Sequence, residues 1–148
     1  MKYLEQFIHN PILAPALTSW LAAQVIKLLL TLLFQKKLVL YRLIDSGGMP
    51  SSHSSTVTTV AVTTGLTAGF NSPLFGVAAI LALIVMYDAA GVRRAAGKQA
   101  KLLNELIENY FAEHYINQKK LKELVGHTPI EVLAGCVLGV IVSLAYFY

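Results

Sequence analysis

Long apolar runs separated by short polar connections dominate this chain of 148 residues. A helix that crosses the hydrocarbon core of a membrane needs about 20 mostly apolar residues. Four windows meet or approach that length, at about residues 12–34, 53–70, 73–91 and 129–148. The 53–70 window is the least apolar because it is rich in threonine, whose hydroxyl can hydrogen-bond back to its own helix. The pattern predicts an all-α integral membrane bundle of about four spans, in a single domain covering residues 1–148.

Residues 92–125 follow a different, amphipathic pattern. Within "KLLNELIENYFAEHY" the apolar side chains recur at helical spacing, and the glutamates fall on other faces. The apolar positions are Leu102, Leu103, Leu106, Ile107, Tyr110 and Phe111. We expect an amphipathic cytoplasmic helix that lies against the membrane surface or against the bundle.

Composition supports the membrane class. The chain is 55% hydrophobic and only 14% charged, with a mean hydropathy of +0.59. A soluble domain of this size needs more polar surface than these residues supply. The single cysteine, Cys136, lies within an apolar run and is expected to be a packing residue. Membrane lipid is therefore the expected partner, with no nucleic acid, and a homo-oligomer is left open.

Basic residues gather on one side of this topology. Ten of the twelve Lys and Arg residues lie in two segments, three in 35–52 and seven in 92–128. With four spans, both segments fall on the same side of the membrane, which the positive-inside rule makes cytoplasmic. Both termini then face outward across a plasma or inner membrane.

Two histidines share that predicted cytoplasmic side. His53 stands in "GGMPSSHSS" at the start of the second span, and His127 stands just before the fourth. The third span ends there too, beside Arg93 and Arg94. One histidine can attack phosphorus while another protonates the leaving oxygen, and arginines and helix N-termini bind phosphate. The constellation predicts a site that binds and transfers phosphate.

Both histidine segments also have a plain structural interpretation. Ser51 or Ser52 is a good N-cap for the second span. In "HTPIE", Thr128 as N-cap, Pro129 at the first helical position and Glu131 three residues after the cap match a capping box. Helix capping explains the serines and Glu131, and it leaves the histidines unexplained.

Charges in and near the spans have alternative roles as well. Arg93 and Arg94 resemble a basic flank that anchors a span to anionic headgroups. Asp88, inside the third span, is expected to face the bundle interior with a partner. Lys27, about two turns from the cytoplasmic end of the first span, can either snorkel to the surface or point into a polar cavity. Such charges leave a channel or transporter open as another class.

Small residues recur four apart in two spans. Gly65 and Gly69, preceded by Ala61, lie in the second span, and Gly135 and Gly139 lie in the fourth. Such spacing lets helix backbones approach closely. It predicts that the second and fourth spans pack together, with chance recurrence in an Ala- and Gly-rich chain as the alternative.

Four stretches together resemble a known superfamily: "GGMPSSHS", "GHTPIEVLAGCVLG", "MYDAAGVRRAAGKQA" and "AAQVIK". They look like the type-2 phosphatidic acid phosphatase and vanadium haloperoxidase superfamily, specifically its small divergent branch of acid phosphatase/vanadium-dependent haloperoxidase-related proteins. The resemblance covers nearly the whole chain. It implies that His127 is the nucleophile that forms a phosphohistidine, that Glu131 orients it, and that His53 protonates the leaving group. It implies no metal and no cofactor.

The chain departs from the superfamily in its remaining motifs. The arginine expected six residues before His127 is Leu121. Lys36 and Arg42 are one residue closer together than in the superfamily's first motif, and Leu43 follows them in place of proline. Other groups are therefore expected to bind the phosphate, and the candidates are Arg93, Arg94, Lys27, Ser51, Ser52 and Gly48. Supporting, structural roles are expected for Asp88 and Asn104.

The leading functional hypothesis is metal-independent hydrolysis of a phosphate monoester on a lipid in the cytoplasmic leaflet. Phosphatidylglycerophosphate or an isoprenoid phosphate is the expected substrate class. The alternative is a catalytically inactive membrane protein that binds lipid headgroups or a protein partner. A vanadate-dependent peroxidase is a more distant alternative.

Overall fold

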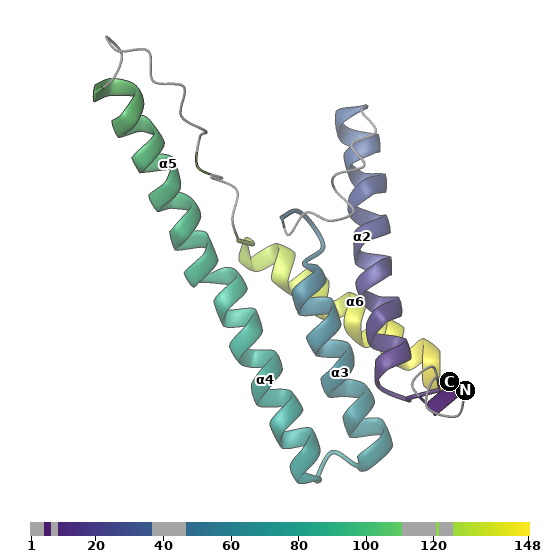
Figure 1. Cartoon of the computed structure of the whole chain (residues 1–148). Coiled ribbons are helices and arrows are strands. Elements are labelled where there is room, and N and C mark those ends of the chain that lie inside the picture. The colour runs from purple at the N-terminus through teal and green to yellow at the C-terminus, as the bar shows by residue number, and fades with distance from the viewer. Residues whose placement is uncertain (1–4, 7–8, 37–46, 111–120, 122–125) are drawn as a thin grey trace.

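The computed structural model describes residues 5–6, 9–36, 47–110, 121 and 126–148. Every regular element in these residues is helical, which confirms the all-α prediction. The helices are α2 (Leu13–Gln35), α3 (Ser52–Ala68), α4 (Pro73–Ala90), α5 (Val92–Tyr110) and α6 (Pro129–Phe147) (Figure 1).

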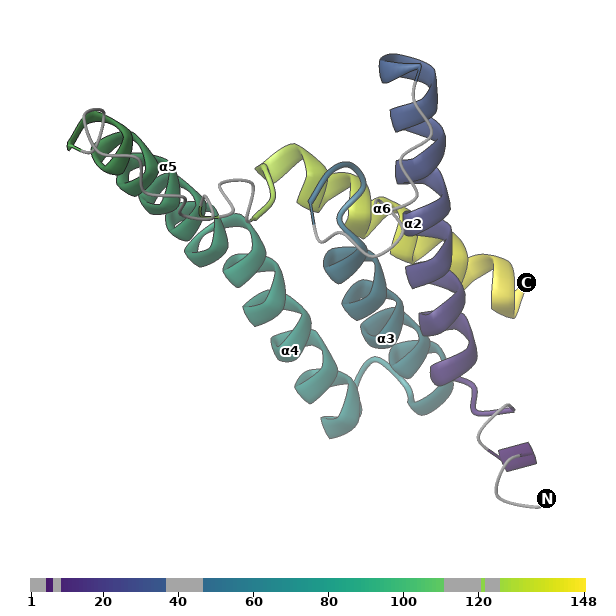
Figure 2. The ribbon, with the colours of Figure 1, turned by 45° about the horizontal axis from the view of Figure 1, so that its top comes forward.

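Helix α3 forms the centre of the bundle and packs against α2, α4 and α6 (Figures 1 and 2). Its buried residues are small and, apart from Ala61 and Gly65, polar. The hydroxyls bond within the helix: Thr59 Oγ1 donates to the Ser55 carbonyl at 2.9 Å, and Thr63 Oγ1 donates to the Thr59 carbonyl at 2.7 Å. Because each hydroxyl is satisfied by its own helix, a threonine-rich helix can occupy the interior.

Glycines of α6 allow it to approach α3 closely. A Cβ atom at Gly135 would overlap the Ser51 carbonyl oxygen, and one at Gly139 would lie 2.6 Å from the Ser55 carbonyl oxygen. The predicted packing of the second and fourth spans is confirmed. The predicted use of the α3 glycines is wrong, because Gly65 faces the ring of Phe70 instead of α6. Serine and threonine residues in the first half of α3 form its side of the contact.

Three helical stretches are long and apolar enough to cross a membrane, among the residues that the structure describes. They are Leu13–Phe34, the 36-residue run Pro73–Glu108, and Pro129–Phe147. Large apolar side chains are exposed on these helices, as expected of surfaces that contact lipid. Helix α3 has 17 residues and is packed among the other three. The count of four spans therefore stays a prediction.

The helices alternate in direction, as the predicted topology requires. The C-terminal ends of α2 and α4 and the N-terminal ends of α3 and α6 lie toward the upper end of the bundle in Figure 1, where the end of α2 extends farther up than the other three. The short connection between α3 and α4 lies at the other end. We call the upper end the histidine end, because His53 is the second residue of α3 and His127 lies two residues before the start of α6.

Helix α5 continues α4 almost in line and projects beyond the bundle (Figures 1 and 2). Only Gly91 separates the two helices, and α5 contacts only α4 among the described helices. Of the two expected positions of this amphipathic segment, packing against the rest of the bundle is not observed for Val92–Tyr110, because the axis of α4 carries α5 away from the other helices. The position at the membrane surface stays a prediction. The rest of the predicted segment, at 111–120 and 122–125, lies outside the described residues.

Candidate functional site

The segment that carries His53 is organised by the start of α3. Ser51 is the N-cap, and its Oγ accepts a hydrogen bond from the Ser54 N–H at 3.3 Å. Gly48, three residues earlier, has a φ of +91°, which favours glycine. Ser51 and Ser52 are buried. The capping prediction is confirmed at Ser51, and it places His53 in the first turn of the central helix.

A single carboxylate organises the segment that carries His127. Thr128 Oγ1 accepts from the Glu131 N–H at 3.3 Å, and Glu131 Oε2 accepts from the Thr128 N–H at 3.0 Å, which together form a capping box. The same Oε2 lies 3.1 Å from His127 Nδ1 and accepts its proton. Glu131 thus caps α6 and orients the ring. With Nδ1 as the donor, the neutral ring carries its lone pair on Nε2.

Three backbone contacts hold the two histidine segments in place. The Ser51 N–H donates to the Glu131 carbonyl at 3.0 Å, and the His127 N–H donates to the Ala89 carbonyl at 2.9 Å. Gly126, with a φ of +117°, packs so closely on the backbone of Arg93 and Arg94 that a Cβ atom would overlap it. The starts of α3 and α6 and the end of α4 are therefore joined directly at the histidine end.

The two histidine rings face each other across this junction. Their centroids are 6.1 Å apart and their planes are inclined by 61°. His127 is 2% exposed. His53 Nδ1 and His127 Nε2 are buried atoms with no hydrogen-bond partner among the described protein groups. Buried nitrogen atoms are nearly always paired, so these two atoms are candidates for contact with water, a ligand or a reacting group.

The surroundings of His127 lower its pKa. Burial has the largest effect, and the positive charges of Lys27 and Arg93 act in the same direction. The hydrogen bond to Glu131 and the charge of that carboxylate oppose the shift. A pKa below the ordinary value of about 6.5 keeps the ring neutral at pH 7. His127 therefore carries a lone pair on Nε2 at physiological pH.

Lys27 points into the bundle and does not snorkel. Its side chain is 2% exposed, and Nζ donates to Gln24 Oε1 at 2.9 Å and to Ser52 Oγ at 3.2 Å. Of the two alternatives from the sequence, the interior position is the one observed. Gln24 was not among the candidate residues. Its signal in the sequence is a second polar residue one helical turn before Lys27, within an otherwise apolar span.

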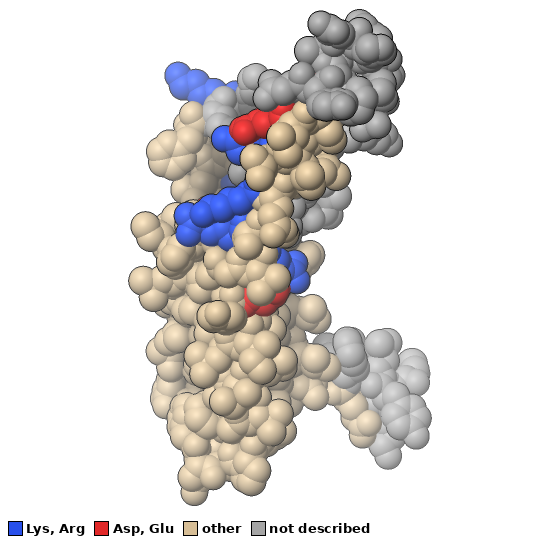
Figure 3. Space-filling model, turned by 90° about the vertical axis from the view of Figure 1, so that its left-hand side faces the viewer, with Lys and Arg blue, Asp and Glu red and all other residues tan. Residues whose placement is uncertain are grey.

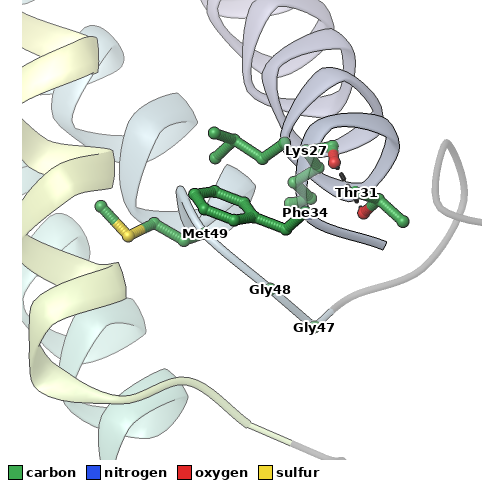
Figure 4. Close-up of a pocket in the computed structure, with 7 residues that line it drawn as sticks. Lys27, Thr31, Phe34, Gly47, Gly48 and Met49 are labelled. Atoms are coloured by element: carbon green, nitrogen blue, oxygen red, sulfur yellow. Dashed lines mark hydrogen bonds between the residues drawn. The ribbon is translucent and has the colours of Figure 1, made fainter. Parts of the chain in front are cut away.

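A cleft of about 250 Å³ opens beside Lys27 (Figure 4). Its lining residues are Lys27, Leu30, Thr31, Phe34, Gly47, Gly48 and Met49. Figure 4 shows Phe34 extending from α2 toward the segment that contains Gly48 and Met49. The cleft therefore joins a buried cation to an apolar wall next to the segment that leads into Ser52 and His53.

The other predicted site residues are placed differently. Arg93 Nε donates to Asp88 Oδ2 at 2.7 Å, and both side chains are more than one-third exposed. Asp88 has the expected charged partner, and the expectation that it faces the bundle interior is wrong, because this partner lies five residues later at the exposed α4–α5 junction. Arg94 is exposed. Figure 3 shows that the basic side chains on the face it draws lie in its upper and middle parts, above an uncharged bottom part.

Asn104 lies apart from the histidines. It is buried on α5, where Nδ2 donates to the Leu121 carbonyl at 2.9 Å and Oδ1 accepts from the Leu121 N–H at 3.0 Å. Eleven residues of helix separate Asn104 from Arg93, a rise of about 16 Å. Asn104 therefore has a structural role in tethering Leu121. That residue stands where the superfamily motif has an arginine.

Comparison with known proteins agrees with this arrangement. The sequence matches the Divergent PAP2 family over residues 8–142, a range that includes both histidine segments. It is also 40% identical over 160 residues to the "Uncharacterized membrane protein YuiD" of Bacillus subtilis (strain 168). That match covers 98% of this chain and 99% of the relative. No solved structure matches the chain. Together with the apolar helices, these matches identify a membrane protein.

Proposed function

This chain belongs to the Divergent PAP2 family, and we propose that it hydrolyses a phosphate monoester of a membrane lipid through a phosphohistidine on His127. The main support for the proposal is the arrangement of three side chains, with Glu131 next to His127 and His127 next to His53. Glu131 accepts the Nδ1 proton of His127, and the Nε2 edge of that ring is buried beside His53. A nucleophile oriented by a carboxylate, with an acid on its far side, suits phosphoryl transfer.

In the first step, the Nε2 lone pair of His127 attacks phosphorus and the bond from phosphorus to the lipid oxygen breaks. His53 donates its proton to that leaving oxygen, so the lipid departs as an alcohol. In the second step, His53 accepts a proton from water, whose oxygen attacks phosphorus. The N–P bond then breaks, which releases inorganic phosphate and restores neutral His127. Neither step needs a redox partner.

Positive charge near the histidines suits the phosphate oxygens. Lys27 is buried and bonded to Ser52, the residue before His53. Arg93 and Arg94 lie at the α4–α5 junction, against which Gly126 packs. In the proposal, Lys27 and Ser52 bind the phosphate from one side and the arginines add positive potential from the other. These groups take the place of the arginine that is Leu121 in this chain.

The proposed location of the site is the cytoplasmic leaflet. Two observations support this orientation: the described basic residues that follow α2 and α4, at 36, 93, 94, 98 and 101, lie toward the histidine end, and the helices alternate in direction. Phosphatidylglycerophosphate and an isoprenoid phosphate remain the proposed substrate class. Both present a terminal phosphate at the membrane surface.

Phosphate release by purified protein in lipid vesicles tests the proposal directly. We expect release from at least one of these lipid phosphates in the presence of EDTA, and loss of that release in His127→Ala. His9→Ala is the matched control, because His9 is an exposed histidine near the N-terminus. A phosphoenzyme trapped during turnover should be labile in acid and stable in base. Release that is absent for both lipids, or unchanged in His127→Ala, contradicts the proposal.

Two observations favour the second candidate function, a protein that binds phosphorylated headgroups without turnover. Leu121 occupies the arginine position of the superfamily motif, and Arg93 is engaged with Asp88. In that case vanadate or a lipid phosphate should bind to the wild-type protein, and no phosphate should be released. Measuring binding and release in the same preparation separates the two candidates.

A further inference from the structure

Helix α5 presents an apolar face that no described helix covers. Leu102, Leu103 and Leu106 lie on one side of α5, and each is about half exposed. Val92 lies on the same side and is 60% exposed. Because α5 contacts only α4 among the described helices, this face has no protein partner within the described chain. An exposed apolar stripe on a membrane protein indicates an interaction surface.

The length of α4 determines where this face lies relative to the bilayer. Helix α4 has 18 residues, Pro73–Ala90, and so rises about 27 Å, close to the thickness of a hydrocarbon core. If α4 spans the membrane, α5 begins at the level of the headgroups. A straight continuation would carry its leucines into water, whereas a turn at the junction would bring them to the interface.

The junction between the helices provides a place for such a turn. Gly91 belongs to neither helix: its N–H bonds to the Tyr87 carbonyl, and its own carbonyl accepts from the Ala95 N–H. The Ala89 carbonyl accepts from the His127 N–H. A turn at Gly91 would break one or both of these bonds and leave the rest of α4 and α5 intact, and a glycine adds no side chain that would oppose the turn.

The charges of α5 indicate which kind of surface its apolar face contacts. Four basic residues lie in the first ten positions of α5, at 93, 94, 98 and 101. At 100° per residue, positions 94, 98 and 101 fall opposite Leu103 and to one side of Leu102 and Leu106. The glutamates Glu105 and Glu108 come later, farther from the end of α4. The part of α5 next to the span is therefore the basic part, which suits anionic headgroups.

We propose that α5 turns from α4 at Gly91 and lies in the headgroup layer of an anionic membrane surface, with Leu102, Leu103 and Leu106 in contact with lipid. Lys98 and Lys101 then contact the anionic headgroups. This assignment is independent of the phosphatase proposal, because it depends on the spanning of α4 and on the two faces of α5.

Site-directed spin labelling tests this placement. In a Cys136→Ser background, a nitroxide is attached at Leu103→Cys on the apolar face or at Lys98→Cys on the polar face. The full-length protein is placed at one copy per nanodisc containing phosphatidylglycerol. We expect the label at 103 to collide with a water-soluble nickel chelate several-fold less often than the label at 98, and to collide more often with oxygen. Phosphatidylcholine nanodiscs should reduce this difference.

Two results would overturn the proposal. Equal access of the nickel chelate to both labels would place α5 in water, in line with α4. Protection of the label at 103 from both nickel and oxygen would place the apolar face against protein instead of lipid. A third label at Val77→Cys, on an exposed position of α4, supplies the reference for a side chain that contacts hydrocarbon.

Discussion

The backbone N–H of Ser51 donates to the carbonyl oxygen of Glu131 at 3.0 Å. This bond joins the N-cap of α3 to the first turn of α6, 80 residues later in the chain. Glu131 also orients His127, and Ser51 is two residues before His53. This bond therefore links both histidine segments. The distance between the two rings thus depends on how α3 packs against α6.

The carboxylate of Glu131 has two functions that a substitution can separate. Glu131→Gln keeps a side-chain oxygen that can cap α6, and it removes the negative charge beside His127. We expect kcat for phosphate release to fall by about 100-fold, within the range typical of lost acid–base assistance. The melting temperature should stay near that of the wild type. Glu131→Ala should lower both kcat and the melting temperature. An unchanged kcat in Glu131→Gln would contradict the proposal that the carboxylate of Glu131 orients His127.

The pH profile should report the lowered pKa of His127. Only the neutral ring can attack, so the rate should fall as the pH decreases through that pKa. Because burial lowers it, the acidic limb of kcat/KM should lie below about pH 6.5. Glu131 raises this pKa, so Glu131→Gln should move the limb to still lower pH. A limb above pH 6.5 would show that the neutral form of His127 is not the controlling species.

The same shift affects stability. A histidine whose folded-state pKa lies below its unfolded value contributes fully above the unfolded value of about 6.5. That contribution is lost as the pH falls from there toward the folded-state pKa. We expect the free energy of unfolding in detergent to decrease over this window in the wild type, and less so in His127→Asn. Equal decreases in both proteins would assign the acid sensitivity to other groups.

Close approach of α3 and α6 depends on glycine. Gly135→Ala and Gly139→Ala would place a methyl group against the backbone of α3, at Ser51 and Ser55. Overpacking of this kind costs about 1–3 kcal/mol of stability, and it should also separate the histidine rings and lower phosphate release. Gly76→Ala on α4 is the matched control, because a Cβ atom there meets no neighbour. Similar behaviour of all three variants would mean that the contact between α3 and α6 is unimportant.

Lys27 should increase the affinity of the site for phosphate and for its analogue vanadate. Lys27→Met keeps an unbranched side chain of similar length and removes the charge that bonds Ser52 Oγ. We expect the apparent Kd for vanadate to rise about tenfold, which corresponds to about 1.4 kcal/mol. Lys98→Met, at an exposed position of α5, should leave it unchanged. Equal effects of the two substitutions would indicate a general loss of positive potential instead of a contact at the site.

Local signals in the sequence were sufficient for the helices and their caps. Apolar windows predict α2, α4 and α6. The sequence also predicts Ser51 or Ser52 as the N-cap of α3 and Thr128 as the N-cap of α6, because a cap and its partners lie within four residues of each other. The dual role of Glu131 as cap and ring partner was also open to prediction, since His127, Thr128 and Glu131 share one helical turn. Alternating helix direction then placed both histidines at one end.

Tertiary structure decided what depends on contacts between distant segments. The 6.1 Å separation of His53 and His127, the bond from Lys27 to Ser52, and the partner surface of Gly135 arise from how α2, α3 and α6 pack. Periodicity reveals that a helix has an apolar face, and it does not reveal what that face contacts, as α5 demonstrates. Sequence alone therefore determined which residues could form the site. Packing of the helices determined which of them meet, because only packing sets distances between residues far apart in the chain.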